Sequence, residues 1–357
     1  MSEKTDDLFH MLPWTEKYRP SSFLEIVSHK HIVNTLKIFI KNKSIPHMLF
    51  YGPPGTGKTT MINICAKELY GDYYQCMVME LNASDDRGID IVRSKIKQFV
   101  TSSNVYFTQN MNSFTNQSTT SNILKLVILD EIDAMTQDAQ SILKKIMETY
   151  SYNTRFCLIC NYIQNINEAL QSRCSTFRFS PILDKDLKIK INEIKEKENV
   201  NISESAIDII INRSGGDMRN ILNMLQSVNM IYNKDHHIID SYDVNTCLGF
   251  PTNEDINKIF HSLLTDNYEN SYKTIVQIKN NFGLSLEDII KDMHNILIEY
   301  LINETIKYDI FNNLTYKNAL EILRDLRTIE YHVVASGEEN IQIGALIGLF
   351  KRYNINR

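Results

Sequence analysis

The sequence predicts an α/β domain built on a parallel sheet with helices on both faces, followed by a small helical domain and a further all-α domain. Three observations lead to this prediction. A short apolar strand, a glycine-rich loop and a helix follow one another at residues 48–69. A second apolar strand ends in two carboxylates, Asp130 and Glu131, and functional groups typically gather at the carboxyl ends of parallel strands. From Leu183 onward the apolar residues recur at helical spacing.

The composition limits the class of protein. At 357 residues the chain is too long for one ordinary core, so we expect two or three domains. No apolar run reaches membrane-spanning length and the first residues lack a secretory segment, which predicts a cytosolic or nuclear protein without a membrane partner. With a net charge of -5, contact with nucleic acid would need a local basic patch. Only Cys157 and Cys160 of the six cysteines have C-x-x-C spacing, and we expect them in a buried strand.

Residues 52–59, Gly-Pro-Pro-Gly-Thr-Gly-Lys-Thr, match the phosphate-binding pattern G-x-x-x-x-G-K-[ST]. The pattern requires a strand before it and a helix after it, and residues 48–51 and 60–69 supply both. Glycines let backbone N–H groups turn inward around a phosphate, and the helix N-terminus adds partial positive charge. Lys58 can reach the β- and γ-phosphates, and the Thr59 hydroxyl can bind Mg²⁺. The sequence therefore predicts a nucleoside triphosphate site.

Residues 14–20, Trp-Thr-Glu-Lys-Tyr-Arg-Pro, precede this loop and allow two interpretations. A lone tryptophan close to Tyr18, Arg19 and Pro20 could fill the domain core. The position of the segment just ahead of the loop favours instead a contact on the adenine side of the nucleotide.

The strand at residues 126–129 ends at Asp130 and Glu131. Beside a phosphate-binding loop, Asp130 would orient the metal and its waters, and Glu131 would activate the attacking water. Asn161 ends another apolar strand, at residues 155–160, and could hold the nucleophilic water or the γ-phosphate. Alone, such an asparagine is more often a turn residue.

Three features lie outside these strands. Residues 102–122 are rich in Ser, Thr, Asn and Gln, which predicts a polar surface insertion that the fold does not need. Arg219 follows Gly215-Gly216-Asp217-Met218 in the first turn of a helix, where the helix dipole disfavours a cation. A phosphate partner would explain Arg219, and a solvent-facing arginine is the alternative. After Pro251 the helices carry no catalytic constellation, which favours an assembly module.

Taken in order, the motifs resemble the small subunits of replication factor C, the eukaryotic clamp loader, within the AAA+ ATPases. They are Trp-x-Glu-Lys-Tyr-Arg-Pro, the phosphate-binding loop, Asn-Ala-Ser-Asp-Asp-Arg-Gly-Ile-Asp, Leu-Asp-Glu, Ser-Arg-Cys and Gly-Asp-Met-Arg. The resemblance implies an AAA+ P-loop domain at 1–180, a helical lid at 181–245 and a helical collar at 246–357. It also implies a nuclear hetero-pentamer of replication factor C subunits. This complex uses ATP and Mg²⁺ to open the sliding clamp PCNA and load it onto primer–template DNA in replication and repair.

The resemblance also implies residue roles. Lys58 and Thr59 match Walker A, Asp130 and Glu131 match Walker B, and Asn161 and Arg219 match the two sensors. Arg173, in Ser-Arg-Cys, matches the arginine finger that acts in trans on a neighbouring subunit's ATP. Arg87 and Arg93 resemble the arginines that track DNA phosphates. The expected nucleotide contacts are Tyr18, Arg19, Pro20, Gly52, Pro53, Pro54, Gly55, Thr56, Gly57, Lys58, Thr59, Thr60, Asn161 and Arg219, with Thr59 and Asp130 at the metal.

Two departures from the family pattern and two alternative functions accompany this hypothesis. Ile132 stands where the family's Asp-Glu-Ala-Asp has alanine, and the insertion at 102–122 lies beside the segment that approaches the clamp. A helicase or unfoldase ring is disfavoured by the Ser-Arg-Cys motif and by the helical end without catalytic residues. A scaffold subunit that holds ATP structurally is disfavoured because Lys58, Thr59 and Glu131 are intact.

Overall fold

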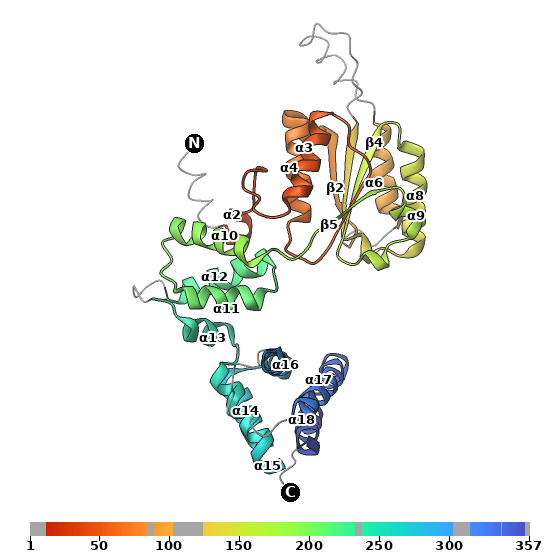
Figure 1. Ribbon diagram of the computed structural model, residues 1–357. Coiled ribbons are helices and arrows are strands. Elements are labelled where there is room, and N and C mark those ends of the chain that lie inside the picture. Colours follow the sequence, from red (N-terminus) through yellow and green to blue (C-terminus); the bar gives the residue numbers. More distant parts are fainter. Residues whose placement is uncertain are drawn as a thin grey trace. The chain divides into compact units, whose positions relative to one another are not determined.

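The computed structural model describes residues 12–84, 89–102, 124–232, 238–302, 315–336 and 338–353. The chain forms two compact units (Figure 1). The first unit comprises residues 1–200 and 210–226, and the second comprises residues 201–209 and 227–357. The predicted three-domain division at residues 180 and 245 stays a prediction.

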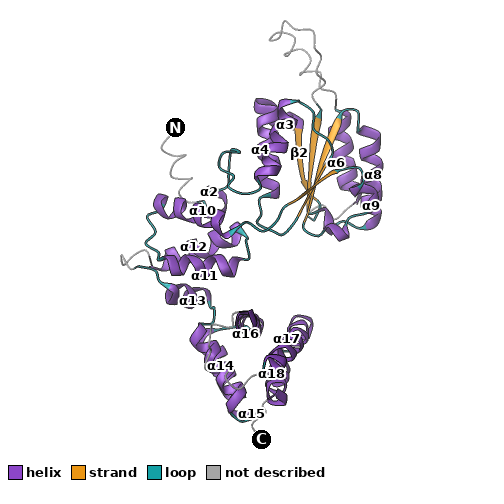
Figure 2. Ribbon diagram, in the orientation of Figure 1, coloured by secondary structure: helices purple, strands orange, loops and turns teal. Residues whose placement is uncertain are grey.

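The first unit is built on a five-stranded parallel sheet (Figure 2). In chain order the strands are β1 (Met48–Tyr51), β2 (Val78–Asn82), β3 (Lys125–Asp130), β4 (Thr154–Cys160) and β5 (Ser175–Arg178). Their order across the sheet is β2-β3-β4-β1-β5. Leu49 of β1 lies opposite Leu158 of β4 and Thr176 of β5. The loop after β1 therefore leaves the sheet beside the ends of β4 and β5.

Helices cover both faces of this sheet, which confirms the predicted architecture (Figure 1). The helices described up to residue 200 are, in chain order, α2 (Trp14–Lys17), α3 (Lys30–Lys41), α4 (Lys58–Tyr70), η1 (Gly71–Tyr73), α5 (Tyr74–Met77), α6 (Ile89–Thr101), η2 (Ile132–Ala134), α8 (Gln137–Tyr150), η3 (Ile163–Asn165), α9 (Glu168–Gln171) and α10 (Asp184–Lys197). Helices α3 and α4 pack on one face, and α6, α8 and α9 pack on the other.

Successive side chains of β1 point to opposite faces of the sheet, so this one strand contributes to two buried clusters. Met48 and Phe50 belong to the cluster with α3 and α4, whereas Leu49 belongs to the cluster with α6 and α8. All three side chains are 0% exposed. A strand buried on both faces reads as a continuous apolar run, as parallel strands between helices do. Burying each such side chain contributes roughly 1.5–3 kcal/mol to folding.

Local details of the strands agree with the sequence, with one shift. The alternating residues 77–82 predict a strand from Met77 onward, but Met77 ends α5 and β2 begins at Val78. Thr136 caps α8, because its hydroxyl accepts a hydrogen bond from the Ala139 N–H at 3.3 Å. Cys157 and Cys160 lie buried in β4, and burial raises the pKa of both thiols. They are small core residues, as the sequence predicted.

The second unit is helical in its described part. Helices α11 (Glu204–Ser214) and α12 (Met218–Tyr232) belong to both units. The helices that lie wholly in the second unit are α13 (Ser241–Leu248), α14 (Asn253–Thr265), α15 (Tyr268–Phe282), α16 (Leu286–Ile302), α17 (Tyr316–Ser336) and α18 (Glu339–Tyr353). One buried cluster joins α14 to α18, and within it the rings of Phe260 and Phe350 meet edge to face at 5.9 Å.

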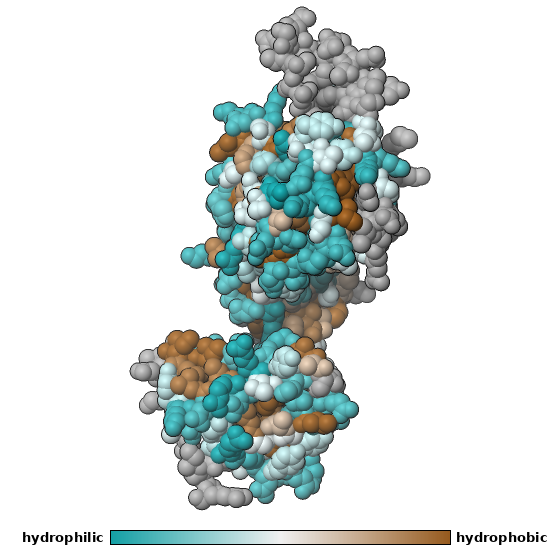
Figure 3. All heavy atoms as spheres, turned by 90° about the vertical axis from the view of Figure 1, so that its right-hand side faces the viewer, coloured by the Kyte–Doolittle hydropathy of each residue, from teal (hydrophilic) through white to brown (hydrophobic). Residues whose placement is uncertain are grey.

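The surface carries both polar and apolar side chains, as Figure 3 shows for one face. Exposed apolar residues on α17 are Tyr316, Leu320, Tyr331 and Val334. Within the ranges that the structure describes, none of the helices has the length and apolarity needed to span a bilayer. Arg87 and the predicted insertion, apart from Ser102, lie outside the described residues.

Candidate functional site: a P-loop cleft

Glycines shape the loop between β1 and α4. Gly52, Gly55 and Gly57 have φ values of +146°, +67° and +90°. Side chains rarely tolerate these values. At Gly52 a Cβ would also lie 2.0 Å from the carbonyl oxygen of Phe179, so no other residue fits. The loop is thereby held close to the sheet, and Gly57 delivers the chain into the first turn of α4.

Lys58 begins α4, and its ammonium turns back into the loop. Its Nζ donates hydrogen bonds to the carbonyl oxygens of Gly52 at 2.7 Å and Pro53 at 2.8 Å, and to Oδ1 of Asn161 at 2.9 Å. Burial lowers the pKa of Lys58, and the nearby Asp130 carboxylate opposes this effect. The loop thus fixes a cation at the mouth of a helix N-terminus, which favours a polyanionic ligand.

Thr59 and Asp130 form the second element of the site. The Thr59 hydroxyl donates to Oδ2 of Asp130 at 2.6 Å, which joins the start of α4 to the end of β3. Oδ1 of Asp130 accepts from the N–H of Glu131 at 2.9 Å. Glu131 has a φ of +56°, an uncommon conformation for a non-glycine residue that suggests a functional constraint. One hydroxyl and one carboxylate in contact fit Mg²⁺, which usually takes few protein ligands and fills its other positions with phosphate and water.

Asn161 follows β4, and its side chain meets the Lys58 ammonium. Its backbone is held by Asp133, whose Oδ2 accepts from the N–H groups of Asn161 at 3.1 Å and Tyr162 at 3.2 Å. Sequence reasoning assigned no role to Asp133. The sequence does offer a sign of this role, because Asp133 is the fourth residue of the Asp-Glu-Ile-Asp run that begins at Asp130.

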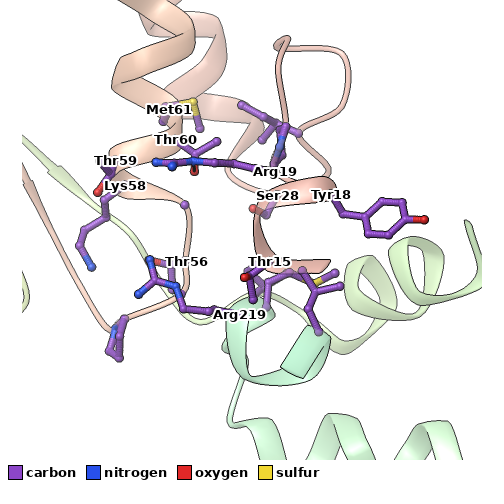
Figure 4. Close-up of a pocket in the computed structure, with 18 of the residues that line it drawn as sticks. Thr15, Tyr18, Arg19, Ser28, Thr56, Lys58, Thr59, Thr60, Met61 and Arg219 are labelled. Atoms are coloured by element: carbon purple, nitrogen blue, oxygen red, sulfur yellow. Dashed lines mark hydrogen bonds between the residues drawn. The ribbon is translucent and has the colours of Figure 1, made fainter. Parts of the chain in front are cut away.

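Helix α12 contributes Arg219 from a distant part of the chain. Oδ1 of Asp217 accepts from the N–H groups of Arg219 at 2.8 Å and Asn220 at 3.2 Å, and so caps the helix. The Met218 N–H donates to the Gly55 carbonyl at 3.3 Å. A Cβ on Gly55 would lie 1.5 Å from Oδ1 of Asp217, so the helix start rests directly on the loop. Figure 4 shows Arg219 reaching toward Thr56 of the loop.

The N-terminal segment closes another side of the site. Trp14 is 6% exposed and belongs to the core, while Tyr18, Arg19 and Pro20 line the cleft. The Arg19 Nε donates to the Thr60 hydroxyl at 3.3 Å. In Figure 4 Arg19 extends toward Thr60, whereas Tyr18 points to the opposite side. Trp14 thus fills the core, and a contact of Tyr18, Arg19 and Pro20 with the nucleotide stays a prediction.

These groups converge on one cleft of about 230 Å³ within the first unit. The predicted residues that line it are Tyr18, Arg19, Pro20, Pro54, Gly55, Thr56, Gly57, Lys58, Thr59, Thr60, Asp130, Glu131, Asn161 and Arg219. Gly52 and Pro53 contribute through their bonds to Lys58. Further lining residues that the sequence did not single out are Ile26, Val27, Ser28, Ile182, Asp186, Lys190 and Leu222. No local motif marks them, since they meet only through the fold.

Arg173 does not line this cleft. It follows α9, where its guanidinium pairs with the Glu148 carboxylate of α8 and donates to the Ala169 carbonyl at 2.7 Å. About a third of the side chain is exposed. Arg93 belongs to α6, but its side chain, like the whole of Arg87, lies outside the described residues.

The chain matches two family models and several curated proteins. The models are "ATPase family associated with various cellular activities (AAA)" at residues 48–182 and "Replication factor C C-terminal domain" at residues 251–348. Replication factor C subunit 5 of Mus musculus is 40% identical over 95% of this chain and 92% of its own length. Replication factor C subunit 3 of Schizosaccharomyces pombe is 41% identical over 95% and 91%.

Solved structures add a likeness in fold. A point mutant of RuvB from Thermotoga maritima superposes with a TM-score of 0.51 at 17% identity. The match covers 75% of this chain and 86% of that one. At this identity the likeness concerns the fold alone.

Proposed function

The chain belongs to the replication factor C subunits, and from this premise we propose that it is the ATP-hydrolysing clamp-loader subunit numbered three in yeast and five in human. In this role it helps to open the sliding clamp PCNA and to load it onto primer–template DNA during replication and repair in the nucleus. The relatives carry the numbers 3 and 5. The observation that carries the proposal is the Lys58 ammonium, held between two loop carbonyls and Asn161.

The residues of the cleft can divide the work of ATP hydrolysis. Bound ATP with Mg²⁺ supplies the phosphoanhydride bond whose cleavage drives the cycle. Thr59 and Asp130 would hold the metal, and Lys58 and Arg219 would offset the charge of the phosphates. Glu131 would accept the proton of the attacking water, and Asn161 would orient that water.

Hydrolysis at this site would also need a partner. Among the described residues that line the cleft, the arginines are Arg19 and Arg219, and Arg173 lies elsewhere. We therefore assign Arg173 to the ATP of a neighbouring replication factor C subunit in a hetero-pentamer. By the same logic, an arginine from another subunit completes the cleft described above.

DNA would be held by a local basic patch, because the whole chain carries a net charge of -5. Arg87 and Arg93 are the proposed phosphate contacts. Replacing both with alanine should reduce the dependence of DNA affinity on salt by about one to two counterions. An unchanged slope of log affinity against log salt would remove them from the DNA path.

Clamp loading by a reconstituted pentamer tests the proposal. Lys58→Ala should abolish the transfer of labelled PCNA to primed circular DNA, and Glu131→Gln should retain ATP binding but load poorly. Lys67→Ala is the matched control, since Lys67 is an exposed lysine on the same helix. Wild-type loading by the Glu131→Gln complex would favour the alternative, a scaffold subunit that holds nucleotide structurally.

A further inference from the structure

The segment Trp14–Pro20, here called the N-terminal strap, is fastened to two helices that follow the sheet in the chain. The Trp14 N–H donates to Oε1 of Gln226 in α12 at 3.0 Å. Lys17 Nζ lies 2.5 Å from Oε1 of Glu198, the residue directly after α10, and the Tyr18 hydroxyl donates to the same oxygen. The strap is thus joined to α10 through one carboxylate and to α12 through one amide.

The other end of the strap touches the P-loop helix. Arg19 bonds to the hydroxyl of Thr60, which follows Lys58 and Thr59 in the first turn of α4. Tyr18, Arg19 and Pro20 also line the cleft. One short segment therefore spans from the P-loop helix to Glu198.

Glu198 is an unexpected residue at the C-cap of α10. A carboxylate at a helix C-terminus is disfavoured by the helix dipole, which favours the cations found in the last turn of α10 at Lys195 and Lys197. Only 19% of the Glu198 side chain and 11% of the Lys17 side chain are exposed. Burial, and then the bond to Glu198, raise the pKa of Tyr18, so the phenol stays protonated and able to donate. The stability of α10 does not explain a carboxylate at this position, whereas the contacts of Glu198 with Lys17 and Tyr18 of the strap do explain it.

We propose that Glu198 is a positioning residue for the nucleotide: its carboxylate holds the strap so that residues 18–20 stay against the cleft. The inference rests on the proposed function, in that the cleft binds ATP. Because coupling between two equilibria is reciprocal, bound ATP should also hold the strap more firmly to α10. Loss of the carboxylate should then loosen the strap and weaken ATP binding together.

Trp14 makes this coupling measurable, since it is the single tryptophan of the chain and lies in the strap. In the full-length chain, acrylamide quenching of its fluorescence reports how far the strap shields it. In wild type, ATP with Mg²⁺ should reduce quenching. Glu198→Gln should increase quenching without nucleotide and raise the Kd for ATP about tenfold. Glu196→Gln, on an exposed glutamate of the same helix, should match wild type in both.

Tyr18→Phe removes one bond to Glu198 without changing the charge, and it should weaken ATP binding in the same direction. Wild-type quenching and Kd in Glu198→Gln would overturn the proposal. A lowered Tm with an unchanged Kd would assign Glu198 to stability alone and would overturn it too. If even wild type fails to bind ATP, the proposed function fails, whereas a quenching difference between wild type and Glu198→Gln would still support the anchoring of the strap.

Discussion

Asp133 fixes the backbone of the asparagine that bonds the Lys58 ammonium, although it does not line the cleft itself. Replacing it with alanine leaves the N–H groups of Asn161 and Tyr162 without their shared acceptor. We predict that Asp133→Ala lowers kcat for ATP by up to about a hundredfold, because small displacements of a catalytic group have large effects. ATP affinity should change little. Steady-state ATPase of the pentamer measures this, with the exposed Asp138→Ala as control. An unchanged kcat would contradict the account.

Arg173 is held by its own subunit's Glu148 at a partly exposed position. We predict that Arg173→Ala lowers turnover at a neighbouring subunit's site by about a thousandfold or more, as removal of an arginine finger does. ATP affinity at this chain's own cleft should stay at the wild-type value. Single-site ATP binding and turnover in the pentamer separate the two, and Arg178→Ala, an exposed arginine of β5, is the control. Weaker binding at the chain's own cleft would refute the assignment.

Single residues differ in how far the sequence reveals them. Lys58 and Thr59 stand in a dense local pattern, so their neighbours in the chain predict their place. Asp217 and Glu198 act on residues far away in the chain, on Gly55 and Tyr18 respectively. Such pairs leave no periodicity or spacing in one sequence. They become visible only when the helices after the sheet are in place.

At the scale of elements, apolar runs predict the strands well and their lateral order not at all. The ends of β3 and β4 were expected near the loop because functional groups gather at the carboxyl ends of parallel strands. The structure places β4 beside β1, and β3 beyond it. The pattern of apolar side chains indicates that a strand is buried on both faces, but it does not indicate which strands lie next to it in the sheet. Met77 shows the related limit at boundaries, since an apolar residue fits the end of α5 as well as a strand.

The end of α6 gives a prediction about the polar insertion. Lys125 Nζ, at the start of β3, donates to the carbonyl oxygens of Phe99 at 2.6 Å and Ser102 at 2.8 Å. The start of β3 thus lies close to the end of α6, and Lys125 gives a partner to one carbonyl of its last turn, that of Phe99. Replacing residues 103–123 with a short Gly-Ser linker should raise the free energy of unfolding by about 1 kcal/mol or less, from the shorter loop. Urea denaturation measures this change.

The variant Lys125→Met should have the opposite effect on the free energy of unfolding to the linker variant. It removes the buried ammonium at the helix end and should destabilise the chain by about 1–3 kcal/mol, because the partly buried carbonyls of Phe99 and Ser102 lose their partner. A linker variant that unfolds as easily as Lys125→Met would show that the insertion supports the fold.

On the scale of the whole molecule, the described residues form the ATP cleft, and Arg173 lies outside it, where we propose that it serves a neighbouring subunit's cleft. We therefore predict that the isolated chain binds ATP but hydrolyses it slowly, at roughly a thousandth of the rate per site in the pentamer or less. ATPase assays at equal chain concentration compare the two. Equal rates would mean that the cleft needs no residue from a partner.

The helical part of the chain after Pro251 predicts assembly with other chains, but it does not predict how those chains are arranged. Its core side chains, such as Phe260 and Phe350, follow helical spacing and are buried as that spacing predicts. Tyr331 and Val334 on α17 follow the same helical spacing, but their side chains are exposed and do not join the buried cluster of the second unit. We propose that other replication factor C subunits cover them, and one sequence does not contain the surfaces of those chains.

Above all, we propose that this chain's ATP cleft works as part of a clamp loader. The most direct test measures ATP hydrolysis by the reconstituted pentamer without ligands, with PCNA, with primed DNA and with both. The account predicts that hydrolysis rises with clamp and primed DNA together, and that Lys58→Ala in this chain diminishes the rise. A rate that neither ligand changes would contradict it.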